Sequence, residues 1–416
     1  MRRTHNGRSK VLFFAYYYPP QKTSGAERPR RFTKYLPDFG YEAIVLSATD
    51  APGIRIVSNS PEDSFPATSP SLLTRFAASA ADIMQRVLDE RSERLPWAAR
   101  AVATARSIVQ QTSVTAIFST SPPLSTHLAA MCLKSAYGIP WVADFRDPFA
   151  DNPIRRSRLQ AWYDPILERR IFRDADAIIA NTDAVSDLWA RRYPEHRQKI
   201  HLIWNGFDPA ESFRPQPIAH RTRHVLAHVG DIYGPRHPGR VLASAERLVA
   251  EGRIDPVRLR IDLVGPVDPT SPLWTMPAFH SLSARGILHA NNQVIPREEA
   301  MQIIGAADYL LLLDFNSVNG NLQVPAKIFD YIRAGRPLLA ETRANSAVDR
   351  ILAQSGAYYV RIEPEDTFQV LDRKIGDFLN SQSRYYEPGP WFWSQFDGRE
   401  QTRRLAAILD GIGVCS

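Results

Sequence analysis

Short apolar runs alternate along this chain with longer segments in which apolar residues recur every three or four positions. Such a pattern predicts strands followed by helices. In the first half, strands are predicted at 11–18, 42–48, 115–121, 140–145, 177–182 and 199–204, and helices at 30–36, 126–138 and 184–194. In the second half, strands are predicted at 224–230, 258–265, 309–315, 337–342 and 357–363, and helices at 240–252, 297–306, 325–335 and 346–356. This alternation is typical of parallel sheets covered by helices, so we predict an α/β chain with two doubly wound, Rossmann-like domains.

The pattern breaks at residues 205–224, where prolines, a glycine and charged residues cluster as they do in interdomain linkers. We therefore predict a first domain over 1–204, a second over 225–384 and a closing segment over 385–416. Residues 51–100 begin Ser- and Pro-rich and continue with an aromatic-poor helical pattern. We expect a mobile inserted loop and helices there, and a solvated connection without a specific role explains this stretch as well.

Length and charge limit the classes of function. With 416 residues and 44% apolar content, the chain can form two domains, each with its own core, and two domains predict a cleft. The 51 Lys and Arg residues exceed the 44 Asp and Glu residues and give a net charge of +7. This balance is compatible with nucleic acid, anionic lipid or a nucleotide as partner, and it does not choose among them.

The cysteine content and the apolar runs predict a cytoplasmic protein. Cys132 and Cys415 are too few for a disulfide framework or a cysteine zinc site and suit a reducing compartment. The basic first ten residues are followed by the short run VLFFA, which lacks the length and cleavage site of a signal peptide. No apolar run approaches the roughly 18 residues of a membrane span. If a membrane matters, we expect the protein to lie on its surface.

Ligands of doubly wound folds bind at the carboxyl ends of the strands, so we expect the functional residues in the segments directly after strands. After the first strand, Ser24 and Gly25 predict a small turn where the backbone can approach a ligand closely. A helix over 27–36 should follow, with Phe32 and Leu36 facing inward. Tight packing of the turn on the sheet explains Ser24 and Gly25 equally well.

A charged segment follows the strand predicted at 140–145. Asp144, Arg146 and Asp147 at this strand end can hold a hydroxyl-bearing substrate, or can satisfy one another as a buried ion pair. Both interpretations stay open. His127 lies within a predicted helix rather than at a strand tip, so a packed, hydrogen-bonded histidine is favoured, although it remains a candidate acid or base.

The second domain opens with a turn that suits a phosphate. Gly230 and Gly234 loosen the chain after the strand, and Arg236 offers a planar fork of donors. The GK[ST] ending of a P-loop is missing.

The stretch VPAKIFDYIRAG predicts a helix with plainly marked ends. Pro325 suits the first helical position and Gly335 the left-handed cap. Lys327 falls in the first turn, where the helix dipole favours an anion over a cation, which indicates an anion bound beside it. Arg236 and Lys327 can neutralise a diphosphate, with Asp330 one turn later on a ribose. The residues expected to face the sheet are Ile328, Tyr331 and Ile332.

Taken in order, YYYPP…SGAERPRR, TSPP, DFRDP, NGFD, GDIYGPR and VPAKIFDYIRAGRP resemble the large family of retaining glycosyltransferases with the GT-B fold that use nucleotide sugars. The resemblance covers nearly the whole chain. It implies two Rossmann-like domains facing a central cleft, with the last helix, in WFWSQFDGREQTRRLAAILDGIG, crossing back to the first domain. It also implies a hexosyl-type transferase that acts in surface polysaccharide or glycoconjugate synthesis.

The resemblance implies roles for residues at matching positions. The donor-binding residues would be Gly230, Tyr233, Arg236, Pro325, Ala326, Lys327 and Asp330. The acceptor-binding residues would be Ser24, Gly25, Arg28, Arg146 and Asp147. The candidate catalytic residues would be Arg236, Lys327, Asp144 and His127. Many members carry two glutamates eight positions apart, whereas this chain has Leu322 and the shorter Asp330 there. This departure leaves a weak or inactive enzyme open.

The expected chemistry is transfer from a nucleotide diphosphate sugar with retention of configuration. Negative charge grows on the β-phosphate as the sugar leaves, and Arg236, Lys327 and the amides near 326–328 are suited to stabilise it. We therefore expect neither a metal nor a cofactor. The acidic pair in DAD at 174–176 fits capping and solvation better than a metal site.

Basic clusters in the first domain suggest where the acceptor is reached. They are Arg2, Arg3, Arg8 and Lys10, then Arg28, Arg30, Arg31 and Lys34, then Arg155, Arg156 and Arg158. We hypothesise that this face rests on the anionic inner face of a membrane and reaches a lipid-linked saccharide. An ordinary solvated basic surface explains the same clusters.

Two other classes of function fit part of the pattern. A GT-B-like nucleotide-sugar epimerase would share the diphosphate site and need acid and base groups, for which His127 and Asp144 are the candidates. A noncatalytic nucleotide-sugar-binding protein is suggested by the missing glutamate. Nucleic-acid binding is disfavoured, because the basic residues are not interleaved with aromatic residues in any recognised module.

Overall fold

The chain folds into two compact units. The computed structural model describes residues 8–21, 24–49, 55–56, 94–150, 152, 158–211, 223–234, 236–314, 322–381 and 384–413. One unit comprises Met1–Asn205 with Gly398–Ser416, and the other comprises Gly206–Asp397. Most of the predicted insertion at 51–100, and residues 212–222 of the predicted linker, lie outside the described residues.

The first unit is built on a seven-stranded parallel sheet with the order β3-β2-β1-β4-β5-β6-β7. Its strands are β1 (Ser9–Phe14), β2 (Tyr41–Ser47), β3 (Arg55–Ile56), β4 (Val114–Ser121), β5 (Trp141–Phe145), β6 (Ala177–Ala180) and β7 (Ile200–Leu202). Its helices are α1 (Ser24–Tyr35), η1 (Leu36–Phe39), α3 (Leu95–Gln111), α4 (Ser125–Tyr137), α5 (Arg158–Asp174), α6 (Asp183–Arg192), η3 (Pro194–Lys199) and α14 (Gly398–Gly413).

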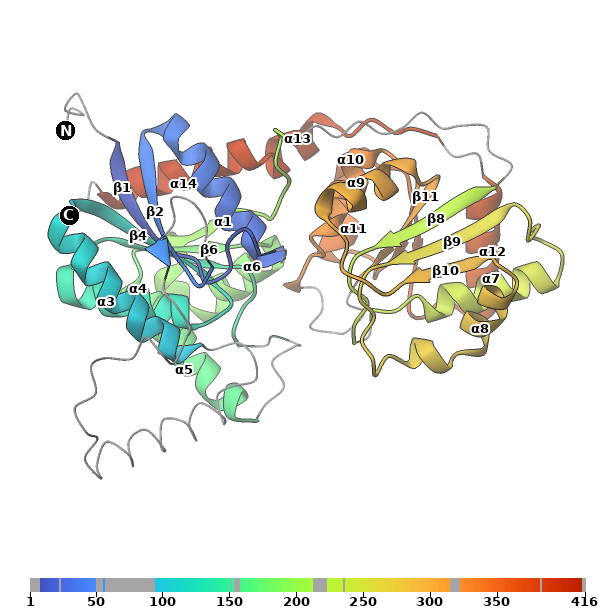
Figure 1. The fold of residues 1–416 in the computed structure, drawn as a ribbon, viewed down its shortest axis with the longest axis horizontal. Coiled ribbons are helices and arrows are strands. Elements are labelled where there is room, and N and C mark those ends of the chain that lie inside the picture. Colours follow the sequence, from blue (N-terminus) through green and yellow to red (C-terminus); the bar gives the residue numbers. More distant parts are fainter. Residues whose placement is uncertain are drawn as a thin grey trace. The chain divides into compact units, whose positions relative to one another are not determined.

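The closing helix α14 packs on the first unit, beside α1 (Figure 1). Its Leu405 and Leu409 join Phe32 of α1 and Phe13 of β1 in one core. The apolar stripe of α14 therefore covers the same face of the sheet as α1, although almost the whole chain separates them. On the other side, α3 and α4 pack against each other.

The second unit is built on a six-stranded parallel sheet with the order β10-β9-β8-β11-β12-β13. Its strands are β8 (His224–Val229), β9 (Leu259–Val264), β10 (Leu288–Asn291), β11 (Tyr309–Leu313), β12 (Leu338–Glu341) and β13 (Tyr359–Ile362). Its helices are α7 (Gly239–Ala250), η4 (Pro272–Thr275), α8 (Pro277–Ala284), α9 (Arg297–Ala306), α10 (Lys327–Ala334), α11 (Ala347–Ser355), α12 (Phe368–Asn380) and α13 (Pro390–Phe396). Helices α7, α8 and α12 share one core with the sheet, and α9, α10 and α11 lie on its other face (Figure 1).

The predicted fold class is confirmed: both halves are doubly wound α/β units, and the last helix returns to the first. The pattern missed β10, because three of its four residues are exposed and the strand lacks an apolar run. Helix α1 begins at Ser24 rather than at residue 27, so Ser24 and Gly25 form its first turn instead of a preceding loop. Phe32 and Leu36 are buried as predicted. The cleft between the domains stays a prediction.

Candidate functional site

The second unit has its switch point between β8 and β11. From β8 the sheet continues through β9 in one direction, and from β11 through β12 in the other. Because helices on opposite faces begin at this place, the carboxyl ends of the two strands leave room for a ligand. The predicted donor residues Gly230 and Lys327 lie at this edge.

Helix α10 is anchored to the end of β8. The hydroxyl of Tyr331 accepts a hydrogen bond from the Val229 amide at 2.7 Å. Ile328, Tyr331 and Ile332 are buried, as their helical spacing predicted. The start of α10 is therefore held in a fixed position beside the strand end.

The ends of α10 differ partly from expectation. The helix begins at Lys327 with Ala326 as its N-cap, so the predicted start at Pro325 is two residues early. The amide of Ile328 donates to the Pro325 carbonyl at 3.1 Å, and it is therefore not free for an anion, contrary to expectation. The C-terminal end is confirmed, since Gly335 is left-handed with φ 63°.

The Lys327 side chain lies directly over Gly230. A Cβ built on residue 230 would stand 2.8 Å from Lys327 Nζ, and φ there is +121°. Only glycine meets both conditions without strain, because other residues rarely adopt this φ and would displace the lysine. The glycine predicted to loosen the turn thus also makes space for the ammonium.

His228 holds the same ammonium from the strand side. Its Nε2 lies 2.9 Å from Lys327 Nζ, and its Nδ1 lies 2.9 Å from the carbonyl oxygen of Leu311 on β11. The imidazole is buried, and burial together with the charges of Lys327 and Arg236 keeps its pKa well below the ordinary value of 6.5. His228 is therefore neutral at neutral pH.

The electrostatics of Lys327 are unusual for a lysine. Burial lowers its pKa to about 7, with Arg236 acting in the same direction and Asp231 opposing it. An anion placed beside the ammonium would restore the charged form. Within the described parts of the chain, no carboxylate lies within ion-pair distance of Lys327 Nζ. This is the electrostatic setting that an anionic ligand complements.

Arg236 and Tyr233 form a compact turn next to this lysine. Nη1 of Arg236 donates to the Tyr233 hydroxyl at 3.0 Å, and its guanidinium lies 5.6 Å from the centre of the tyrosine ring. The Arg236 amide also donates to the Tyr233 carbonyl at 3.1 Å. The structure thus places Gly230, Tyr233, Arg236 and Lys327 close together after β8 and at the start of α10, and their role in donor binding stays a prediction.

Asp330 faces different partners. Nη1 and Nη2 of Arg297, the first residue of α9, donate to its two carboxylate oxygens at 3.0 Å each. Arg297 also binds Glu211 at 2.8 Å. Lys327 and Asp330 were expected to face one spot, whereas the structure pairs Lys327 with His228 and Asp330 with Arg297. A carboxylate in such a pair keeps lone pairs for ribose hydroxyls, so the ribose role of Asp330 stays a prediction.

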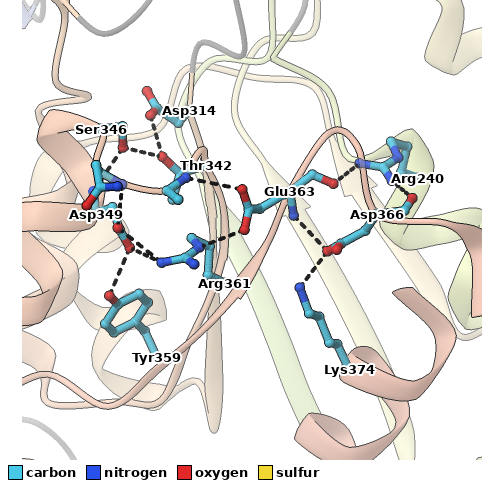
Figure 2. Close-up of polar contacts among 12 residues, drawn as sticks. Arg240, Asp314, Thr342, Ser346, Asp349, Tyr359, Arg361, Glu363, Asp366 and Lys374 are labelled. Atoms are coloured by element: carbon cyan, nitrogen blue, oxygen red, sulfur yellow. Dashed lines mark hydrogen bonds and ion pairs between the residues drawn. The ribbon is translucent and has the colours of Figure 1, made fainter. Parts of the chain in front are cut away.

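The neighbouring strand ends carry a separate polar network, drawn in Figure 2. The Thr342 hydroxyl donates to Asp314 at 2.7 Å, and Arg361 pairs with Asp349 at 3.0 Å. Its labelled members are Arg240, Asp314, Thr342, Ser346, Asp349, Tyr359, Arg361, Glu363, Asp366 and Lys374. Since its carboxylates are already bound by hydroxyls and cations, we assign the network to the stability of this sheet edge.

In the first unit, Arg28 and Asp144 form a buried ion pair. Nη2 of Arg28 lies 2.7 Å from Oδ1 of Asp144, and the Thr120 hydroxyl donates to Oδ2 at 2.8 Å. Arg28 also donates to the carbonyls of Ile203 and Trp204 at 2.9 and 2.6 Å. Asp144 is in a buried ion pair, but its partner is Arg28 of α1 and not Arg146 of the same segment, so the expected pairing within 144–147 is wrong for Asp144. Neither residue presents a group to a substrate, which corrects the expected roles of Arg28 at the acceptor and Asp144 in catalysis.

Arg146 stays at the strand edge as a candidate acceptor residue. Its Nε donates to the Ser121 carbonyl at 3.1 Å, and its Nη1 lies 2.0 Å from where a Cβ of residue 25 would stand. Burial lowers its pKa, and the carboxylate of Asp147 beside it raises that pKa again. Gly25, Arg146 and Asp147 are therefore neighbours, with the guanidinium over the first turn of α1, which begins at Ser24.

His127 is a core residue. Its Nδ1 lies 2.7 Å from the Ser119 hydroxyl, and its ring packs 4.5 Å from that of Phe145. It has no exposed surface, and burial lowers its pKa to about 3, with a smaller contribution from Arg146. The packed, hydrogen-bonded interpretation is confirmed, and the catalytic one is corrected, because α4 turns this side chain toward the sheet.

Both aspartates of DAD are bound by neighbouring side chains or amides. Asp174 pairs with Arg170 at 2.6 Å, and Asp176 binds Lys134 and accepts from the Trp141 amide at 2.7 Å. In the described ranges, no three His, Cys, Asp or Glu side chains are grouped so as to hold a metal ion.

Sequence reasoning missed His228 and Arg297. His228 is the one polar side chain in the run VLAHVG at 225–230, two positions before Gly230, and that interruption was the available signal. Arg297 is a cation in the first turn of α9, where the helix dipole disfavours positive charge, as it does at Lys327. The same signal that indicated Lys327 therefore indicates Arg297 as well.

Comparison with known proteins agrees with this architecture. Residues 29–211 match the model of glycosyltransferase family 4. No curated protein matches the sequence. Among solved structures, sucrose-phosphate synthase from Thermosynechococcus elongatus superposes with a TM-score of 0.60 and 14% identity, covering 98% of each chain. HepE from Anabaena, in complex with UDP-glucose, gives 0.59 and 14%, covering 97% of this chain and 99% of that one.

A third similar structure is WaaG, described as a glycosyltransferase involved in lipopolysaccharide biosynthesis. It gives a TM-score of 0.55 and 14% identity, covering 97% of this chain and 99% of that one. Identities at this level establish a shared fold. The chain thus has the two-domain fold of these proteins, and its residues 29–211 resemble glycosyltransferase family 4.

Proposed function

We propose that this chain is a glycosyltransferase that moves a sugar from a nucleotide diphosphate sugar to a hydroxyl acceptor, with retention of configuration and without a metal. The observation that carries the proposal is the Lys327 ammonium, which lies over Gly230 at the carboxyl end of β8. The match of residues 29–211 to glycosyltransferase family 4 supports it. The HepE structure with UDP-glucose makes uridine diphosphate sugars the first donors to test.

The chemistry follows from charge. As the bond between sugar and β-phosphate breaks, negative charge grows on the phosphate oxygens, and preorganised donors lower the barrier by stabilising it. Lys327 and Arg236 supply positive charge, and the start of α10 adds the positive end of its dipole. The chain's own cations therefore take the part that a divalent metal plays in other transferases.

The test is a thermal-shift screen of nucleotides and nucleotide sugars on the wild-type chain and on Lys327→Ala and Arg236→Ala. We expect one diphosphate sugar to raise the melting temperature of the wild type and of the control Arg253→Ala, whose side chain is exposed, and to leave both site variants unchanged. Turnover with that donor should persist in EDTA. Equal stabilisation of all four proteins would contradict the donor site.

The two other classes give distinct outcomes in the same assay. An epimerase would convert the bound donor to its epimer without an acceptor. A noncatalytic binding protein would be stabilised by the donor but would neither transfer nor hydrolyse it. The burial of His127 and Asp144 leaves the epimerase without the acid and base proposed for it.

For the acceptor, we propose a lipid-linked saccharide at an anionic membrane surface on the cytoplasmic side. Of the basic residues expected on this face, Arg28 and Arg31 are buried, which corrects that cluster. Arg2, Arg3, Arg155 and Arg156 lie outside the described residues. The supporting observation is instead on α5, where Trp162 and Ile166 lie one turn apart and are 68% and 56% exposed. Arg169 and Arg173 continue the same exposed stripe. Apolar and basic residues on one helix face suit an anionic lipid surface. Among the helices in the described ranges, none is long and apolar enough to cross a bilayer.

Vesicle flotation tests the membrane surface. We expect the chain to float with vesicles that contain anionic lipid, and the double variant Trp162→Ala/Ile166→Ala to remain in solution. Val257→Ala/Val294→Ala, which removes two exposed residues of the second unit, is the control. Failure of the wild type to float with either neutral or anionic vesicles removes the membrane from the proposal.

A further inference from the structure

The Lys327 side chain at the proposed donor site is held in place by neighbouring residues. A lysine ammonium sits on a flexible four-carbon stem, and its orientation is lost unless neighbours fix it. On one side of the ammonium, Gly230 has no side chain and so leaves space for Nζ. On the other side, His228 Nε2 lies 2.9 Å from Nζ. The lysine is therefore confined between a glycine and a histidine.

The protonation of His228 follows from its other nitrogen. A carbonyl oxygen only accepts, so Nδ1 must carry the proton in its 2.9 Å contact with Leu311. In a neutral imidazole, Nε2 then has a free lone pair, and it accepts from the Lys327 ammonium. A protonated ring would instead repel Lys327 and Arg236, in line with the strong lowering of the His228 pKa. Strand β11 thus sets the tautomer that receives the lysine.

We propose that His228 is a positioning residue of the donor site: its Nε2 lone pair fixes the Lys327 ammonium over Gly230, where the diphosphate of the donor binds. This inference rests on the proposed function and names a residue that acts through Lys327 rather than on the substrate.

Packing alone does not account for this arrangement. A buried histidine that serves only the core needs no cationic partner, and a cation costs free energy there unless an anion offsets it. Two charged groups act on Lys327: Arg236 repels it, and Asp231 attracts it. Among the described residues, no ion pair joins Asp231 to Lys327. The charge of Lys327 in its contact with His228 is therefore offset only when an anion binds beside it.

The first experiment is a binding cycle with a nucleoside diphosphate, measured by calorimetry. We expect His228→Phe to raise Kd about tenfold, as the loss of an oriented charge-assisted contact would. His228→Gln, whose amide oxygen can accept near the place of Nε2, should restore part of the affinity. In a Lys327→Ala background, His228→Phe should change Kd less than about twofold, because the residue to be positioned is gone.

His224→Phe is the matched control, since it changes a histidine four residues earlier on the same strand, at the far end from Lys327. If His228→Phe weakens binding equally with and without Lys327, its effect is structural and the inference is overturned. If Lys327→Ala itself binds as tightly as wild type, the donor site fails instead. The two failures are thus distinguishable.

A measurement without ligand tests the contact directly. With ¹⁵N-labelled lysine, the Nζ resonance of Lys327, assigned with Lys327→Ala, should shift in His228→Phe and not in His224→Phe. A resonance that is the same in all folded variants overturns the inference, whatever the nucleotide experiments give.

Discussion

Arg28 and Asp144 form a buried ion pair that joins helix α1 to the end of strand β5. The pair is fully enclosed, with side-chain exposures of 1% and 0%. Removing one partner would leave a charge buried without compensation.

We therefore expect Asp144→Asn to lower the free energy of unfolding by about 3–5 kcal/mol. Asp187→Asn, at an exposed position of α6 in the same unit, should change it by less than about 0.5 kcal/mol. Urea denaturation of both variants measures this. An Asp144→Asn chain that is as stable as Asp187→Asn but inactive would restore Asp144 as a catalytic candidate.

Gly25 and Arg146 should be energetically coupled. The methyl group of Gly25→Ala would stand 2.0 Å from Arg146 Nη1, so the guanidinium must move from its bond to Ser121. We expect a loss of about 1–3 kcal/mol in the wild-type background. In an Arg146→Ala background the clash is gone, and the substitution should be neutral or stabilise the helix by up to about 1 kcal/mol. Additive effects in the two backgrounds would contradict this coupling.

Donor affinity should depend on pH through Lys327. Its pKa of about 7 rises when an anion binds, so binding takes up a proton once the free lysine is neutral. Affinity for a nucleotide sugar should then be greatest below about pH 7 and fall by up to tenfold per pH unit above it. Calorimetry in buffers of different ionisation enthalpy measures both effects. Lys327→Arg, which stays charged, should bind with a flat profile.

Glu341 should make the protein less stable as pH rises. Burial raises its pKa to about 7, with Arg240 opposing the shift at 3.7 Å. Its Oε2 has no hydrogen-bond partner in the described part of the chain. A raised pKa means that the folded chain binds the extra proton, so this contribution is full below about pH 4.5 and is lost as pH rises through about 7.

Glu341→Gln mimics the protonated acid and removes that loss. We expect it to exceed wild type in stability at about pH 8 by on the order of 1–3 kcal/mol, and to match it near pH 5. Thermal or urea unfolding at the two pH values is the measurement. Glu365→Gln, at an exposed acid, is the control. A Gln variant that is destabilised at both values would show that the pair with Arg240 dominates instead.

Asp330 should recognise ribose. If its carboxylate accepts from the ribose hydroxyls, Asp330→Ala raises Kd for a ribonucleoside diphosphate about tenfold or more, and has little effect on a dideoxy analogue. Asp255→Ala, at an exposed turn of the same unit, serves as control. Equal weakening of both ligands would indicate that Asp330 acts only by holding Arg297.

Local pattern was sufficient for the fold class and for part of the site. Strand and helix periodicity, the break near residue 205 and the glycine cap at Gly335 depend on residues close in sequence. The same holds for Lys327, whose cation at a helix start conflicts with the local dipole and so indicates a ligand. These features are visible because their physical causes act within one or two turns of chain.

Partners that come from distant segments of the chain could not be predicted from local pattern. His228 meets Lys327 across 99 positions, and Arg28 meets Asp144 across 116. No local pattern states which strand end lies beside which helix start, because sheet order and helix packing are set by the whole core. The same carboxylate at a strand end could face solvent or an arginine, and burial by α1 made Asp144 structural. Residue type and local spacing identify the residues that could carry the chemistry, and the packing of helices on each sheet leaves only some of them accessible to a ligand.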